Sequence, residues 1–413
     1  ETDDMGKHFD VNNNFYYCPN EPLDTSAIPL PNGIEVDDSN EMAAEYAETV
    51  ARCTGNDRFD AHPQANDWYE TVKLNYGVDY CDWGGRSTHF EPIPDTWHKM
   101  TDILLFWAAK GIDGFRCDMA EMVPHEFWKY ATEKVKAQYP HIIFIGEVYD
   151  PNQYRTYLAA GFDYLYDKVG MYDCLRDVMC GHRPASDITR QWQATDDIRE
   201  HVLYFLENHD EQRIASDFFC GNMQKGIPAL IVSALFQCNP VMIYAGQEFG
   251  ERGMDGEGFS GVDGRSTIFD YWSVDAIRKG FFERSELSAE QLQLEKNYRT
   301  ILTLCNSEKA VREGKTFDLT YANEANESFD SSRLFAFLRS SGNTTLLIVA
   351  NFGETEAHVR VNIPSHAFDY MELKEGKKDM VDLLSGNYQT ATLQRDGAIE
   401  MIVPAFSGRV YKF

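Results

Sequence analysis

Gly111-Ile-Asp-Gly-Phe-Arg-Cys-Asp-Met-Ala-Glu121 is the stretch around which the rest of the chain is organised. It predicts a short buried strand that ends in charged residues. Because side chains alternate along a strand, Arg116 and Asp118 point to one side, and Phe115 and Cys117 point to the other. Charge at the end of a buried strand is costly unless it has a partner or a chemical task. On this stretch alone, an ion pair that only stabilises the sheet edge is an equally good interpretation.

Helical patterns lie on both sides of this strand, which is typical of a parallel sheet with both faces covered. The alternation of helix and strand continues over residues 94–306 and predicts an α/β fold with right-handed crossovers. We expect strands at Ile112–Met119, Ile142–Tyr149, Phe162–Tyr166, Val202–Leu206 and Val241–Ala245, and helices at Asp95–Lys110, His125–Gln138, Asn152–Ala160, Tyr172–Met179, Asp187–Arg199, Gly226–Gln237 and Ala289–Cys305.

The two ends of the chain differ from this middle part. Residues 1–93 are irregular, with one acidic helix expected near Ser39–Arg52, and they resemble a long excursion from the sheet. Residues 307–413 carry short alternating segments separated by turn residues, which predicts an all-β sandwich or barrel. Its expected strands are Arg333–Arg339, Thr345–Asn351, His358–Ile363, Met371–Lys374, Ile399–Val403 and Arg409–Phe413.

The amino-acid composition limits which classes of molecule this protein can bind. The formal charge is −28, from 38 basic and 66 acidic residues, so nucleic acid is excluded as a partner and a neutral substrate is favoured. The longest apolar run, Ile227–Phe236, is too short to span a membrane. Nine cysteines with no Cys-x-x-Cys pair indicate neither a zinc site nor a full disulfide framework. The sequence does not identify the compartment, although a periplasmic or secreted location is slightly favoured over a cytoplasmic one.

Three carboxylates end three of the expected strands: Asp118, Glu147 and Asp210. Carboxyl ends of parallel strands share one edge, where the chemistry of barrels and open α/β sheets takes place. Glu147 continues a row of isoleucines, and apolar surroundings favour the neutral form that a general acid needs. Arg116 favours the ionised form of Asp118 that a nucleophile needs. Each acid alone is better explained as a cap or an ion pair, but three at one edge match the requirements of glycosidic cleavage.

Several motifs resemble those of the α-amylase family of retaining glycoside hydrolases. Gly114-Phe-Arg-Cys-Asp118, Gly146-Glu147-Val148 and Asn208-His209-Asp210 resemble the family's motifs on barrel strands four, five and seven, in the family's order. Asn239-Pro-Val-Met-Ile-Tyr-Ala-Gly-Gln-Glu248 resembles the strand-eight motif. Val72-Lys-Leu-Asn75 resembles the motif of the inserted loop domain in neopullulanases and cyclomaltodextrinases.

The resemblance implies an architecture: a (β/α)8 TIM barrel of which strands four to eight are present. The barrel occupies residues 94–306, the inserted loop domain residues 1–93, and the β-sandwich domain residues 307–413. Strands one to three and the motif that ends strand three are absent, so we expect the native protein to have a further N-terminal part. Strand four would otherwise present an unpaired apolar edge.

The resemblance also implies roles for single residues. Asp118 is the expected nucleophile, Glu147 the acid and base, and Asp210 the stabiliser of the transition state that binds two sugar hydroxyls. Arg116 is expected to orient Asp118, and His209 to donate a hydrogen bond to the sugar. Asn208 is a further predicted member of the substrate-binding rim. Arg213 is expected to help orient this rim, with a surface ion pair as an equally good interpretation. Tyr149 is expected to line the site beside Glu147, although a packed loop aromatic is the commoner interpretation.

The implied activity is hydrolysis of α-glucosidic bonds, mainly α-1,4, in starch, maltodextrin or cyclodextrin. Two alternatives stay open: a transglycosylase or isomerase with the same three acids, and an inactive amylase-like protein that binds glycans. No organic cofactor is expected. A structural calcium ion is an open expectation without nameable ligands, since the family's site uses an asparagine from the absent motif. Glu121 and Met122 replace a Lys-His pair common in α-amylases, which weakens a specific assignment to endo-action on long chains. In a retaining enzyme the carboxylates of Asp118 and Glu147 should lie about 5–6 Å apart.

Overall fold

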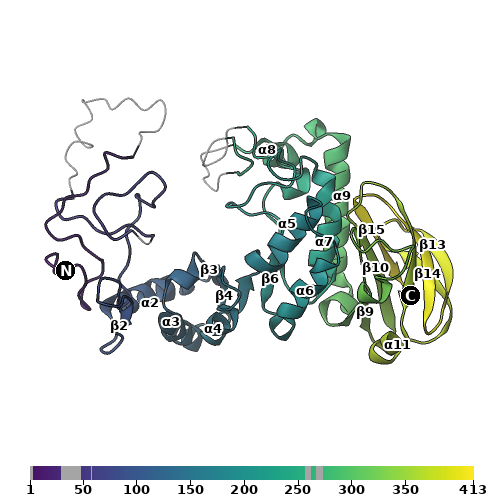
Figure 1. Ribbon diagram of the computed structural model, residues 1–413, viewed down its shortest axis with the longest axis horizontal. Helices are drawn as coiled ribbons and strands as arrows, with labels where there is room; N and C mark the ends of the chain where they lie inside the picture. The colour runs from purple at the N-terminus through teal and green to yellow at the C-terminus, as the bar shows by residue number, and fades with distance from the viewer. Residues whose placement is uncertain (1–2, 29–47, 57, 256–261, 267–272) are drawn as a thin grey trace. The chain divides into compact units, whose positions relative to one another are not determined.

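The structure is a computed structural model that describes residues 3–28, 48–56, 58–255, 262–266 and 273–413 (Figure 1). Contacts within the chain divide it into two compact units. Unit 1 comprises residues 1–145 and 159–162, and unit 2 comprises residues 146–158 and 163–413. The three domains predicted from the sequence stay a prediction, because this division follows contacts and cuts the chain elsewhere.

Unit 1 begins with loops, as the sequence predicts (purple in Figure 1). The regular strands in their described part are β1 (Val78–Asp79) and β2 (Ser87–Thr88), which pair antiparallel. The loops are held by a small core that consists of Tyr16, Cys18, Ala51, Cys53 and Ala61.

The acidic helix expected near Ser39–Arg52 falls mainly on residues 39–47, outside the described ranges. Its last expected residue, Arg52, forms an antiparallel bridge with Tyr17. This end of the segment is therefore extended.

The helix–strand part of unit 1 follows the predicted order. It contains α2 (Asp95–Ala108), β3 (Gly114–Cys117), the 3₁₀ turn η1 (Ala120–Met122), α3 (His125–Gln138) and the start of β4 (Ile143–Gly146).

The predicted bounds of α3 are confirmed, because its buried residues recur at three- and four-residue spacing along one face. In β3, Gly114 runs so close to the next strand that a Cβ atom would lie 2.5 Å from the carbonyl oxygen of Ile143. Only glycine fits at this position.

In unit 2, strands β5, β6 and β7 pair in parallel, with Leu165 opposite Val202 and Tyr204 opposite Val241. All four residues of β6 are buried, and so is every residue of α7, which agrees with a parallel sheet covered on both faces. The elements of this region are α4 (Tyr154–Ala159), β5 (Tyr164–Tyr166), the π-helical turn η2 (Lys168–Tyr172), α5 (Asp173–Met179), α6 (Asp187–Ala194), η3 (Asp196–Ile198), β6 (Val202–Phe205), η4 (Met223–Lys225), α7 (Gly226–Leu235), β7 (Val241–Met242), η5 (Gln247–Phe249), α8 (Asp275–Phe281), η6 (Arg284–Glu286), α9 (Ala289–Ser307) and α10 (Lys309–Arg312).

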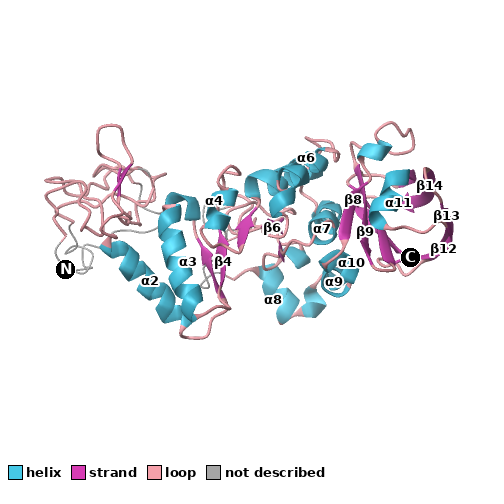
Figure 2. Cartoon of the chain, turned by 90° about the horizontal axis from the view of Figure 1, so that it is seen from below, coloured by secondary structure: helices cyan, strands magenta, loops and turns pink. Residues whose placement is uncertain are grey.

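The C-terminal part of unit 2 consists mainly of two sheets (magenta near the C-terminus in Figure 2). One has the strand order β13-β12-β15-β10-β9-β8, and the other pairs β11 with β14. A shared core of residues from both sheets lies between them, as expected for a sandwich. The elements are β8 (Lys315–Asp318), η7 (Tyr321–Asn323), β9 (Leu334–Ser341), β10 (Thr344–Asn351), β11 (Ala357–Ile363), α11 (Ser365–Met371), β12 (Gly376–Asp382), β13 (Tyr388–Leu393), β14 (Gly397–Val403) and β15 (Ser407–Lys412).

One predicted strand in this region is wrong. Met371–Lys374 alternates like a strand, but Met371 ends helix α11, whose buried residues Ala367, Phe368 and Met371 recur at helical spacing. Strands β8, β12 and β13 were not predicted from the sequence. Strand β12 begins Gly-Lys-Lys-Asp and has few apolar residues to mark it.

The sheet is joined to the preceding helices by a buried arginine. Arg339 of β9 is fully buried and donates hydrogen bonds to the carbonyl oxygens of Phe236, Ala310 and Val311. A buried guanidinium with several carbonyl partners satisfies the need of a charged group for hydrogen bonds. None of the helices in the described ranges combines the length and the hydrophobicity that a transmembrane span requires.

Candidate active site

In unit 1, the end of β3 carries the predicted Arg116–Asp118 pair. A guanidinium nitrogen of Arg116 donates a hydrogen bond to the carboxylate of Asp118. Cys117 is buried, whereas 73% of the Asp118 side chain is exposed, so the predicted alternation of sides is confirmed. The next residue, Met119, has φ of 38°, in the left-handed region that non-glycine residues rarely adopt. The chain therefore turns sharply as soon as it has presented Asp118.

In unit 2, Glu147 is the first residue after β4. Its side chain is only 2% exposed. The hydroxyl of Tyr149 donates a hydrogen bond of 3.0 Å to Glu147 Oε1. Both residues lie in the irregular segment that directly follows β4. Glu147 is thus a buried acid in a fixed orientation.

The end of β6 forms a tight turn around Asn208. Its side-chain oxygen accepts hydrogen bonds from the backbone N–H groups of Asp210 at 2.9 Å and Glu211 at 2.8 Å. An asparagine that bonds to the backbone two residues on shapes a turn. Asn208 is 2% exposed, so in this structure its side chain stabilises the turn.

This turn presents His209 and Asp210 toward solvent. Their side chains are 25% and 44% exposed, and Nε2 of His209 lies 3.1 Å from Oδ2 of Asp210.

Tyr149 brings the ends of β4 and β6 into one electrostatic neighbourhood. Burial raises the pKa of its hydroxyl well above 10, and the negative charge of Glu147 raises it further. Asp210 and Glu211 contribute in the same direction. Tyr149 therefore stays a neutral hydrogen-bond donor with acids of both strand ends near it. The predicted separation of Asp118 and Glu147 stays a prediction, because these residues belong to different units.

Arg213 is buried, with 1% of its side chain exposed. Its guanidinium donates to Glu207 Oε2 at 2.7 Å, to the hydroxyl of Ser266 at 2.9 Å and to the carbonyl oxygen of Ala245 at 2.8 Å. A surface ion pair, one of the interpretations of Arg213 from the sequence, is therefore wrong. Arg213 instead orients the loop that carries Asp210, and it does so from below the surface.

A second charged cluster lies at this edge and was not predicted from the sequence. Nζ of Lys168 lies 3.1 Å from Asp173 Oδ1, 3.2 Å from Glu211 Oε1 and 5.9 Å from the centre of the Tyr149 ring. Lys168 follows β5 by two residues, so its place at the sheet edge was the only signal in the sequence that could have identified it. The cluster places a cation among the acids around Tyr149.

A buried carboxyl group also follows β5. Asp167 is 1% exposed, and it accepts a hydrogen bond of 3.2 Å from the hydroxyl of Tyr154. Its Oδ2 atom has no hydrogen-bond partner among the described residues. Burial raises the pKa of Asp167 to about 6. The π-helical turn η2 wraps this carboxyl group so tightly that a Cβ atom at Gly170 would lie 2.2 Å from Asp167 Oδ1.

The raised pKa of Asp167 predicts a pH-dependent stability. Folding favours the protonated carboxyl group, so this contribution is complete below about pH 4 and is lost as the pH rises through about 6. It amounts to up to about 3 kcal/mol. Asp167→Asn is expected to remove this part of the pH dependence. Urea unfolding between pH 4 and 7 measures it.

The matched control is Asp102→Asn, which changes an exposed aspartate of α2. This control should keep the wild-type slope of stability against pH. A wild-type slope in Asp167→Asn would contradict the assignment of the pH dependence to this carboxyl group.

The described residues do not identify a calcium site. No three side chains of His, Cys, Asp or Glu among them come together as a group able to hold a metal ion. The structural calcium ion stays a prediction, and no step proposed below depends on one.

A protein-family model matches this chain. Residues 93–323, more than half of the chain, match the family model "Alpha amylase, catalytic domain". The match includes Asp118, Glu147 and Asp210.

Comparison with individual proteins gives distant relatives. Alpha-amylase MalA of Haloarcula japonica is 26% identical over 340 residues, which cover 81% of this chain and 43% of that protein. Cyclomaltodextrinase of Geobacillus thermopakistaniensis is 21% identical over 290 residues, which cover 69% of this chain and 44% of that protein. The chain thus spans less than half the length of these two curated relatives.

A solved structure, the noncanonic maltogenic alpha-amylase AmyB from Thermotoga neapolitana, has a TM-score of 0.59 at 17% identity. The alignment covers 81% of this chain and 70% of that one. At this identity the likeness shows a shared fold.

Proposed function

The chain belongs to the alpha-amylase catalytic-domain family, and from this premise we propose that the protein is a retaining glycoside hydrolase that cleaves α-glucosidic bonds, mainly α-1,4, in starch, maltodextrin or cyclodextrin. The observation that carries the proposal is the family match over residues 93–323, within which Asp118 and Glu147 directly follow β3 and β4, and Asp210 lies in the loop after β6. The hydrogen bonds that orient each acid support it.

The proposed mechanism assigns one task to each strand end. Asp118, oriented by the Arg116 hydrogen bond, attacks the anomeric carbon while Glu147 gives its proton to the leaving glycosidic oxygen. The product is a β-glycosyl ester on Asp118 and a free chain end. Glu147 then takes a proton from water, and the water oxygen displaces Asp118 with a second inversion, so the α configuration is retained.

Asp210 and His209 supply the binding of the distorted sugar in this proposal. Both side chains are partly exposed on a turn that Asn208 holds in shape, so they can reach hydroxyl groups of a sugar. Hydrogen bonds that strengthen as the ring distorts lower the barrier more than they tighten substrate binding.

We also propose the barrel that the motifs imply. Strands β3 to β7 then correspond to strands four to eight of a (β/α)8 barrel, and residues 1–93 to the inserted loop domain. Parallel pairing of β5, β6 and β7, together with the acids that follow β3, β4 and β6, supports this assignment.

The proposed activity is tested with the intact protein and soluble starch. Hydrolysis releases reducing ends, and proton NMR of the first products should show the α anomer. If transfer products form without a net gain of reducing ends, the protein is a transglycosylase and not a hydrolase. Starch or maltotriose binding without any turnover would overturn the enzyme assignment.

Tyr149→Phe is expected to lower kcat roughly 10- to 100-fold, because a hydrogen bond to a carboxylate is worth about 1.5–3 kcal/mol. Without the phenol hydroxyl, Glu147 loses the donor that orients it. Initial rates of starch hydrolysis measure the loss. The control Tyr388→Phe, at a tyrosine that is 80% exposed on β13, should keep the wild-type rate. Equal rates in both variants would contradict an orienting role for Tyr149.

A further inference from the structure

One face of helix α5 lies against the loop that follows Asp210. Tyr172, Arg176 and Cys180 are spaced four residues apart, at the end of η2, within α5 and directly after it. Residues at this spacing are neighbours on one side of a helix. All three contact residues of the segment 211–220, which is the loop leading away from Asp210.

The first two contacts are polar. The hydroxyl of Tyr172 donates to Glu211 Oε2 at 3.1 Å. The guanidinium of Arg176 donates to Gln212 Oε1 at 2.6 Å, and its central carbon lies 4.3 Å from the centre of the Phe219 ring. The helix therefore holds both the beginning and the end of this loop.

The third contact is between two thiols. Sγ of Cys180 lies 3.9 Å from Sγ of Cys220, and 3.7 Å from the carbonyl oxygen of Phe219. Both cysteines are partly exposed, so a small molecule can reach them. The backbone N–H of Cys220 donates to the carbonyl oxygen of Ile214 at 3.2 Å, which makes Cys220 a part of the folded loop.

We propose that Cys180 and Cys220 are a thiol–disulfide exchange site, which a small-molecule disulfide such as oxidised glutathione converts into an intramolecular disulfide. Because a disulfide has an S–S distance of about 2 Å, the sulfurs must approach by about 2 Å, which is within the reach of side-chain rotation.

The exchange runs in two balanced steps. One cysteine thiolate attacks the small-molecule disulfide, forms a mixed disulfide and releases one small thiolate. The second cysteine thiolate then attacks the protein sulfur and releases the second small thiolate. The two protons lost by the cysteines are taken up by the released thiolates. The protein is oxidised by two electrons, and the small disulfide is reduced to two thiols.

Either cysteine can attack first, because both are partly exposed. Once one of them carries the mixed disulfide, its sulfur lies beside the other thiol, which completes the exchange.

The disulfide would join α5 covalently to the loop of Asp210. The two cysteines are 40 positions apart, and the ring that they close contains β6 and the Asn208 turn. A covalent link across a long loop reduces the freedom of the unfolded chain, so oxidation should raise the thermal midpoint. The proposed sugar-binding loop would then be fixed in the position that its hydrogen bonds already favour.

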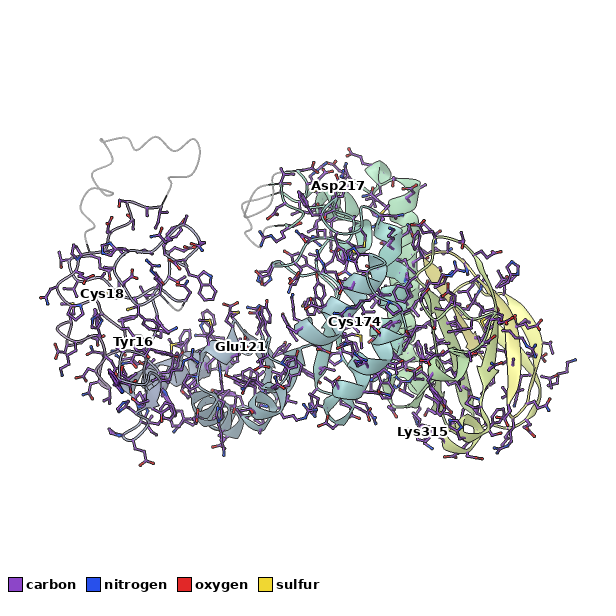
Figure 3. All side chains as sticks on the ribbon, viewed as in Figure 1. Tyr16, Cys18, Glu121, Cys174, Asp217 and Lys315 are labelled. Carbon is purple, nitrogen blue, oxygen red and sulfur yellow. The ribbon has the colours of Figure 1, made fainter. Side chains whose placement is uncertain are left out.

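The chain offers two useful controls (both labelled in Figure 3). Cys18, in the loops of unit 1, lies 3.9 Å from the sulfur of Cys53, so a second disulfide could form there. Cys18→Ser removes it and serves as the background for all measurements. Cys174 lies on α5 itself but is fully buried, so Cys174→Ser is a matched substitution on the same helix.

The experiment equilibrates the background protein in buffers of oxidised and reduced glutathione. Free thiols are then alkylated, and peptides are mapped by mass spectrometry. We expect a peptide pair linked through Cys180 and Cys220 that disappears in excess reduced glutathione. The oxidised protein should melt a few degrees above the reduced protein, and this difference should vanish in Cys220→Ser but persist in Cys174→Ser.

Two results would overturn the proposal. One is glutathione adducts or free thiols at Cys180 and Cys220 without any linked peptide. The other is a melting difference that persists in Cys220→Ser. If Cys220→Ser does not fold, Cys180→Ser gives the same comparison. These measurements do not depend on hydrolysis, so they test the disulfide proposal independently of the proposed activity.

Discussion

Asp118→Asn is expected to lower kcat on soluble starch on the order of 10⁴-fold, because an amide cannot form the glycosyl ester on which the proposed mechanism depends. The substitution keeps the size of the side chain and its ability to accept a hydrogen bond from Arg116. Asp118 is 73% exposed in its unit and packs against little, so folding should be unaffected. The loss would therefore report on chemistry.

The matched control is Asp113→Asn, on the same segment at a side chain that is exposed before β3. It should keep the wild-type rate of reducing-sugar release. Thermal melting of both variants should agree with that of the wild-type protein.

A second experiment distinguishes a nucleophilic role of Asp118 from a role in which its carboxylate forms no bond to the sugar. In Asp118→Ala, sodium azide can take the place of the missing carboxylate at the anomeric carbon. With an activated α-glucosyl substrate, azide should restore turnover and give a β-glucosyl azide. Wild-type activity in Asp118→Asn, or an α-configured azide product, would contradict the proposed role.

Arg213→Met is expected to destabilise unit 2 by about 3–5 kcal/mol, because it leaves Glu207 buried without its cation. Glu207 is 2% exposed, and its other oxygen accepts the backbone N–H of Ile214 at 2.8 Å. Burial raises the pKa of Glu207, and Arg213 opposes this rise. Without the guanidinium the carboxyl group must either stay charged in an apolar place or take up a proton.

Chemical denaturation of the variant measures this cost. The control is Arg252→Met, which removes an exposed arginine that pairs with an exposed aspartate, Asp217. Such surface pairs contribute at most about 1 kcal/mol. The double variant Glu207→Gln with Arg213→Met should recover part of the loss, since no buried charge is left. Equal stability of Arg213→Met and Arg252→Met would contradict the argument.

The ion pair of Arg213 with Glu207 also affects the candidate site, because these two residues flank Asp210 in the sequence. The ion pair closes the base of the loop, and Asn208 shapes its tip. Loss of the pair should therefore lower activity even at temperatures where the variant is folded.

The sequence predicted the region from α2 to β7 well, because local periodicity carries that information. Alternation placed Arg116 and Asp118 on one side of β3, and the three- and four-residue spacing gave the bounds of α3. The strands of the structure are shorter than predicted, since the polar residues at their ends leave the sheet to form turns. Apolar and polar residues alternate over 371–374, which predicted a strand. This prediction was wrong, because Met371 and the apolar residues just before it belong to helix α11.

The three acids of the candidate site could be predicted from the sequence, but the side-chain contacts that orient them could not. Asp118, Glu147 and Asp210 stand out because each follows an apolar strand. Nothing in the sequence indicated that Tyr149 bonds to Glu147, or that Lys168 lies beside Glu211. Asn208 was predicted to bind substrate, yet it is buried and its side chain accepts hydrogen bonds from the loop backbone. Arg213 was predicted to orient the rim, and it lies buried at the base of the Asp210 loop, paired with Glu207.

The sequence by itself determined the strands from β3 to β7, the side-chain alternation in β3 and the acids that follow β3, β4 and β6, since each of these follows from neighbouring residues. Tertiary structure alone decided how the strand-end loops are held. The Arg213–Glu207 pair depends on a loop that folds back on itself, and the contact of Cys180 with Cys220 depends on a helix that meets a loop 40 residues further along. Such contacts arise from the path of the chain through space, which periodicity in the sequence does not specify.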